Sequence, residues 1–184
     1  NLIVAHLGGG ISVGAHKNGK IIEVNNALNG DGPFAPTRSG KVPAIDLIEM
    51  CFSGKYSEEE LKELITKKGG LVSHLGTSDA RDVVKMIAEG NEYAKLVYDA
   101  MIYQVAKEIG AQSVVLKGKV DAIILTGGMA YDEYFIKTLK EYISFIGKVV
   151  IIPGEEEMQA LSNGVLRVLN GEEKAQEYTG VPVK

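Results

Sequence analysis

Two clusters of glycines are candidates for a functional site, because of their composition and their place in the sequence. Gly8–Gly10 stand between two apolar stretches, with His6 just before them and Ser12 just after, and Gly127–Gly128 follow another apolar run. Each glycine costs roughly 0.5–1 kcal/mol relative to alanine in a regular element, so such runs indicate an unusual turn or a close backbone approach. Backbone N–H groups of a turn without side chains can point at phosphate oxygens. A plain hairpin bend explains Gly8–Gly10 equally well.

The strands that would carry these glycines can be predicted from the pattern of apolar residues. Residues 2–7 are typical of a buried strand. Residues 11–17 and 20–27 predict a hairpin that turns at Asn18-Gly19, because a type I′ turn needs positive φ twice. Two further strands, "VDAIILT" before Gly127–Gly128 and "KVVIIP" after the next helix, complete the set.

Helical spacing predicts the remaining elements, and Ser57 with Glu60 forms a capping box at the start of one of them. The helical segments are "VPAIDLIEMCF", "SEEELKELITKK", "TSDARDVVKMIAEG", "NEYAKLVYDAMIYQVAKEIGAQSVVL", "AYDEYFIKTLKEYI" and "EEEMQALSNGVLRVLNG". Three antiparallel strands followed by α, β, α, β, α predict a ribonuclease H-like α/β fold, with a mixed sheet and helices on both faces. Ligands gather at the strand carboxyl ends of such sheets, where both glycine clusters fall.

Composition bounds the class of protein. With 184 residues and 45% apolar residues we expect one domain, 1–184, and the net charge of −4 gives no basic field for nucleic acid. No apolar run approaches the roughly 20 residues of a membrane span. The single cysteine, Cys51, excludes an internal disulfide; its apolar run "IEMCF" predicts a buried thiol and a reducing, cytoplasmic setting. The chain begins inside an apolar strand without Met, so we expect the back half of a longer protein.

The loop "NALNGDGPFAPTRSGKVP" is rich in turn formers, and loops of this length inside a domain are usually functional. The chain matches neither the Walker pattern G-x-x-x-x-G-K-[ST] nor a G-x-G-x-x-G that opens a helix, so both common nucleotide folds are set aside.

Together with "HLGGGISVGAHKNGK", this loop resembles the signature region of the acetokinase family, and its sequence is most similar to that of the butyrate kinases. Acetate kinases usually carry an asparagine where this chain has Gly9. "TSDARDV", "ILTGGMAYDEYF" and "IIPGEEEMQALSNGVLRVL" resemble the family's nucleotide and closing segments. The resemblance implies the C-terminal domain of a two-domain kinase of the acetate and sugar kinase, heat-shock chaperone and actin superfamily.

The resemblance also implies site residues. Arg38 matches the family's active-site arginine, whose guanidinium fork suits the equatorial oxygens of a transferred phosphoryl group, and His6 would donate a hydrogen bond to that group. The nucleotide contacts and the magnesium-associated glutamate that it implies are Gly8, Gly9, Gly10, Ser12, Asp79, Arg81, Gly127, Gly128, Met129, Ala130 and, for the metal, Glu156.

Some of these residues have a structural interpretation as well. A capped helix start explains Asp79 and Arg81 equally well. An acidic helix start explains the run of three glutamates around Glu156, and one sequence does not say which of the three faces a metal. "GGMAYD" departs from the acetate-kinase "GGIGEN" at the positions that follow Gly128.

The expected activity is an ATP- and Mg²⁺-dependent carboxylate kinase that converts butyrate, or a related short or branched acid, into an acyl phosphate and ADP. The expected partners are this acid, an N-terminal domain of the same protein and further copies in a homo-oligomer. The alternatives are an acetate or propionate kinase, a chaperone-like or actin-like ATPase and a non-catalytic nucleotide-binding module.

Overall fold

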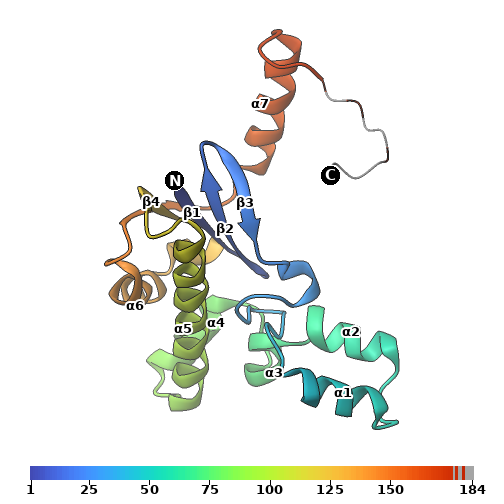
Figure 1. Cartoon of the computed structure of the whole chain (residues 1–184). Coiled ribbons are helices and arrows are strands. Elements are labelled where there is room, and N and C mark those ends of the chain that lie inside the picture. The colour runs from blue at the N-terminus through green and yellow to red at the C-terminus, as the bar shows by residue number, and fades with distance from the viewer. Residues whose placement is uncertain (176, 178–179, 181–184) are drawn as a thin grey trace. The chain divides into compact units, whose positions relative to one another are not determined.

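The computed structural model describes residues 1–175, 177 and 180; the other positions of the polar C-terminal segment lie outside the described residues. Its internal contacts divide the chain into two units, Asn1–Gly154 and Glu155–Lys184, and each is described by itself. The first unit holds a five-stranded sheet in the order β3-β2-β1-β4-β5 (Figure 1). The strands are β1 Leu2–Leu7, β2 Ile11–Lys17, β3 Lys20–Val24, β4 Ala122–Gly127 and β5 Lys148–Pro153.

The strand pairing confirms the predicted mixed sheet of an α/β fold. β1 and β3 both pair antiparallel with β2, whereas β4 pairs parallel with β1 and with β5. Asn18 and Gly19 have φ values of 52° and 75°, as the type I′ hairpin turn requires. β3 is shorter than predicted, ending at Val24 rather than at 27, because the Asn25 side chain turns inward: its Oδ1 accepts from Val13 N and its Nδ2 donates to Ile11 O.

The helices follow the predicted order, with one addition. The capping box of Ser57 and Glu60 is present, and a short helix at residues 70–75, absent from the prediction, precedes the segment "TSDARDV". The helices and 3₁₀ turns of the first unit are η1 Ala27–Asn29, α1 Ala44–Phe52, α2 Glu58–Thr66, α3 Gly70–Leu75, α4 Ala80–Ala88, α5 Glu92–Val115, η2 Gly128–Tyr131 and α6 Glu133–Ile143. The second unit contains α7, Glu157–Leu169.

The prediction of a buried Cys51 is wrong. Its thiol is exposed, as are Ile45 and Phe52 on the same helix, and α1 has no buried residue. The apolar run does form a helix, but an apolar face is buried only where a neighbouring element covers it.

One hydrophobic core lies between the sheet and the helices α5 and α6. Alternate residues of β1, namely Ile3, Ala5 and Leu7, are completely buried in it together with residues of both helices. α5 contacts β1, β2 and β3, as Figure 1 shows for this long helix beside the sheet. The intervening residues of β1, including His6, are half-buried and point to the opposite, less covered face. Among the described residues, no helix is long and apolar enough to pass through a lipid bilayer.

Candidate functional site

The two glycine clusters meet at one edge of the sheet. Gly8–Gly10 form the turn between β1 and β2, and the Gly8 N–H donates to Gly10 O across 3.3 Å. Gly127 ends the neighbouring parallel strand, and a Cβ built on it would lie 2.6 Å from Leu7 O. The chain therefore brings both clusters to the carboxyl ends of β1 and β4, as predicted. The Gly8 amide is engaged within the turn itself.

His6 and Ser12 lie side by side on the less covered face of the sheet. They are directly opposite residues of the antiparallel pair β1–β2, where Cβ atoms are about 4.5–5.5 Å apart. His6 is also in register with Thr126 of β4, so the three side chains form a row over adjacent strands. Thr126 donates its hydroxyl to Gly154 O at 3.2 Å. Sequence reasoning missed Thr126, although its place directly before Gly127 was the available signal.

Arg38 reaches the same edge from the loop that follows β3. Its guanidinium packs against the backbone of Gly10. Its Nε is buried without a hydrogen-bond partner in the described part of the chain, and no ion pair is found between Arg38 and a described carboxylate. A partly buried guanidinium without a counter-ion among the described residues is suited to binding an anionic ligand.

Backbone hydrogen bonds fasten the loop on both sides of Arg38. Thr37 donates from its N–H and its Oγ1 to Gly9 O, at 3.2 and 3.0 Å, which ties the loop to the glycine turn. The Ser39 N–H donates to Ile65 O at 3.0 Å, and the Gly69 N–H to Thr37 O at 3.1 Å. The position of the Arg38 backbone is therefore set by the glycine turn together with the end of α2 and the start of α3.

Two contacts tie the same loop to α5. The Phe34 N–H donates to the Gln104 side-chain carbonyl at 3.0 Å, and Lys41 Nζ donates to Glu108 Oε2 at 2.9 Å. The Glu108 carboxylate raises the pKa of Lys41, chiefly through this hydrogen bond. Because Glu108 is only 9% exposed, its charge needs this partner. These polar contacts connect the loop to the helix that forms the core.

The second glycine cluster opens η2, in which one exposed glycine is followed by two buried residues. Gly128 is exposed with open space around its Cα, whereas Met129 and Ala130 belong to the hydrophobic core. Met129 and Ala130 could therefore approach a ligand through main-chain atoms only, and Gly128 is the accessible member of the predicted adenosine segment. Asp132 ends η2 and caps α6 by accepting from Tyr134 N and Phe135 N.

A buried tyrosine holds this cap in place. The Tyr98 hydroxyl donates to Asp132 Oδ2 at 2.6 Å from within the core. Burial first, and then the Asp132 carboxylate, raises the pKa of Tyr98 far above its ordinary value, so the phenol stays protonated as a donor. The position of η2 is thereby linked to α5.

Asp79 and Arg81 have the geometry of a helix cap. Asp79 is the N-cap of α4 and accepts from the Arg81 N–H at 2.9 Å, while Arg81 Nη2 donates to Asp79 Oδ2 at 2.6 Å. These bonds lower the pKa of Asp79 to about 2. In the described part of the chain their hydrogen bonds stay within this helix start, as the capped-helix interpretation expects.

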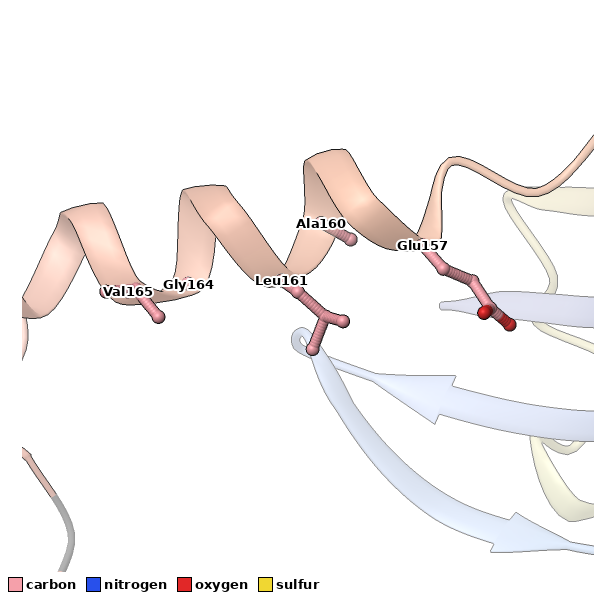
Figure 2. A pocket seen from close by; sticks show the side chains of 5 residues that line it. All are labelled: Glu157, Ala160, Leu161, Gly164 and Val165. Atoms are coloured by element: carbon pink, nitrogen blue, oxygen red, sulfur yellow. The ribbon is translucent and has the colours of Figure 1, made fainter.

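Glu156 lies in the second unit, at the N-cap of α7, where its side chain makes no capping hydrogen bond. A hollow lined by Glu157, Ala160, Leu161, Gly164 and Val165 lies along α7 (Figure 2). It contains none of the predicted site residues, and its lining comes from a single helix. Among the described residues, no group of three or more His, Cys, Asp or Glu is placed to hold a metal ion.

Comparison with known proteins gives the family. The family model described as "Acetokinase family" matches residues 1–160. "Butyrate kinase 2" of Clostridium acetobutylicum is 57% identical over 178 residues, which are 97% of this chain and 50% of that protein. The chain thus spans about half the length of this relative.

Solved structures agree. The acetate kinase of Porphyromonas gingivalis is 27% identical with a TM-score of 0.80, over 90% of this chain and 48% of that one. A propionate kinase from Francisella tularensis is 26% identical with a TM-score of 0.76, over 86% of this chain and 47% of that one. The match over residues 1–160, most of the chain, shows that the chain belongs to the acetokinase family.

Proposed function

We propose that the protein containing this chain phosphorylates butyrate, or a related short or branched carboxylate, with ATP to give an acyl phosphate and ADP, reversibly. The identity of 57% to "Butyrate kinase 2" supports this activity and this class of acid. The chain, 1–184, is the C-terminal nucleotide-binding domain. An N-terminal domain of the same protein completes the acid pocket, and the half-length match supports such a division.

The single observation that carries the proposal is the position of the Arg38 guanidinium and its lack of a partner among the described residues. Its guanidinium lies on the glycine turn, its Nε has no partner among the described residues, and its loop is fastened to that turn through Thr37. Phosphoryl transfer needs positioning and charge stabilisation more than covalent catalysis. An unpaired guanidinium held beside the main chain of the glycine turn would supply both.

The chemical step can be written with these residues. A carboxylate oxygen forms a bond to the γ-phosphorus of ATP, and the bond from that phosphorus to the bridging oxygen breaks, leaving its electron pair on ADP. No strong general base is needed, because carboxylic acids with pKa values near 4 are ionised at neutral pH. Arg38 stabilises the equatorial oxygens and His6 donates to the same group. The amides of Gly9 and Gly10 and the Ser12 hydroxyl bind the β- and γ-phosphates.

Mg²⁺ would accompany the nucleotide and neutralise phosphate charge. Magnesium keeps several waters and is usually bound through one or two carboxylates and the substrate phosphates. Glu156 is the proposed carboxylate, and Gly128 the proposed adenosine contact, with Asp79 and Arg81 along the same nucleotide. We further propose a cytoplasmic homo-oligomer.

A second candidate is an acetate or propionate kinase, which the two solved structures favour through their likeness in fold. It shares every step above and differs only in the length of acid that the pocket accepts. A chaperone-like or actin-like ATPase, or a non-catalytic module, would form no acyl phosphate with any acid.

The test uses the full-length protein with Mg-ATP and a panel of acids from acetate to isobutyrate and valerate, with hydroxylamine to trap acyl phosphate. We expect product to peak at four carbons or at a branched acid, and to fall by roughly 100-fold or more in Arg38→Ala. Arg167→Ala is the matched control, because Arg167 is a half-exposed arginine of α7 paired with Glu173. ATP hydrolysis without trapped product for any acid would refute the proposal.

A further inference from the structure

The space that a side chain at position 10 would fill is occupied by Arg38. A Cβ built on Gly10 would lie 1.7 Å from Arg38 Nη1, 2.4 Å from Cζ and 3.0 Å from Nε. Gly9, its neighbour in the same turn, has nothing within 4 Å of such an atom. Neither glycine has positive φ, so the backbone conformation itself does not require glycine at either position. In the space that a side chain would need, the two glycines thus differ by the Arg38 guanidinium, which lies beside Gly10 alone.

We infer that Gly10 is a positioning residue for Arg38, and that its bare Cα forms the seat of the guanidinium during phosphoryl transfer. This inference rests on the proposed function and deepens it. The role differs from donating an amide to phosphate, which any residue could do through its main chain.

Packing rather than a counter-ion holds the guanidinium on this seat. In the described residues no carboxylate pairs with Arg38, and its Nε is buried without a partner. A delocalised, planar guanidinium tolerates such a contact better than a strongly hydrated ammonium group would. With Nε enclosed, the direction in which the fork points is set by the surface on which it lies.

The loop cannot relieve a clash by moving its backbone. Thr37 donates twice to Gly9 O, the Ala35 N–H donates to Arg38 O at 3.0 Å, and the Ser39 N–H donates to Ile65 O. A methyl group at position 10 would therefore displace the flexible end of the Arg38 side chain and leave the main chain in place. We expect the Gly10→Ala protein to fold, with its guanidinium off the seat.

The kinetic test uses the full-length enzyme with butyrate and Mg-ATP. Gly10→Ala should lower kcat on the order of 100-fold, since a misplacement of about 1 Å reaches this size, with little change in the KM for ATP. Gly110→Ala, a control for the added methyl group, should keep kcat near that of the wild type, because Gly110 lies within α5, lacks positive φ and has nothing within 4 Å of an added Cβ. In an Arg38→Ala background, Gly10→Ala should cause no further loss, because the occupant of the seat is already gone.

A second readout does not depend on activity. The ¹⁵N-labelled Nε–Hε signal of Arg38, assigned by its loss in Arg38→Lys, should exchange slowly with water in the wild type and in Gly110→Ala, and quickly in Gly10→Ala. If no Arg38-dependent acyl phosphate forms at all, the proposed function fails, while this signal still tests the seat. An unchanged signal in Gly10→Ala, an unchanged kcat, or losses that multiply with Arg38→Ala would overturn the inference.

Discussion

Replacing Gly127 by alanine should destabilise the fold, whereas the same change at Gly128 should not. Gly127 has φ of 92° and ψ of 176°, a region that is essentially restricted to glycine. A Cβ there would also lie 2.6 to 2.8 Å from backbone atoms of Leu7 in the neighbouring strand. Gly128 is exposed, lacks positive φ and has open space around its Cα. The two adjacent glycines therefore form a matched pair.

The loss of stability in Gly127→Ala follows from the unfavourable backbone conformation and from the steric contact with Leu7. A side chain held in such a backbone conformation costs about 1–3 kcal/mol. Forcing a methyl group against a backbone that cannot swing aside adds about 1–3 kcal/mol. A total of about 4 kcal/mol is a large part of the roughly 5–15 kcal/mol that stabilises a domain. For a chain of this size it lowers Tm by roughly 8–16 °C.

The assay is urea and thermal unfolding of the 184-residue chain, followed by far-UV circular dichroism because the chain has no tryptophan. Both variants lose the same entropy of a glycine from the unfolded chain, so comparing them cancels that effect. Equal unfolding midpoints for Gly127→Ala and Gly128→Ala would refute the argument that close approach to β1 requires glycine at position 127.

Three further outcomes follow from the contacts described above. Tyr98→Phe should lower the free energy of unfolding by about 1.5–3 kcal/mol, since Asp132 loses a charge-assisted hydrogen bond, and urea titration of the two proteins measures this difference. The folded-state pKa of Asp79, about 2, lies below its ordinary 3.8, so the stability it contributes is present above about pH 4 and is lost as pH falls towards 2; unfolding measured against pH should lose this component in Asp79→Asn. The isolated 184-residue chain should bind nucleotide yet show negligible acyl phosphate formation in the hydroxylamine assay, and a robust rate would contradict a site shared with an N-terminal domain.

Much of the fold could be predicted because its signals are local. The Asn18-Gly19 turn requires two positive φ values, and the Ser57 and Glu60 side chains reach each other within one helical turn. The early end of β3 was not predictable, since it depends on Asn25 bonding to β2 across the sheet. The exposure of Cys51 was missed for a similar reason, because a run of apolar residues does not say which element, if any, will cover it.

The candidate site likewise has features that the sequence predicted and features that depend on long-range contacts. Glycine composition and strand order predicted that the two clusters would meet at one edge, and they do. The contact of Arg38 with Gly10 joins residues far apart in sequence, and the row of His6 with Thr126 depends on strand register. Neither pairing leaves a periodic trace in the sequence. Asp79 illustrates the converse, since its local signal as a cap is what the structure displays.

The backbone hydrogen bonds at the base of the segment that holds α1 and α2 affect how far this segment can vary in sequence during evolution. The Ser39 N–H donates to Ile65 O and the Gly69 N–H donates to Thr37 O. These two hydrogen bonds join the ends of the segment 40–68 next to Arg38. The middle of this segment, around the exposed bend at Lys55, is distant in sequence from those hydrogen bonds. Exposed bends tolerate insertion and variation. Lengthening or replacing this middle part should leave Arg38 in place, so residues 40–68 can vary in sequence and length while the contacts around Arg38 are kept.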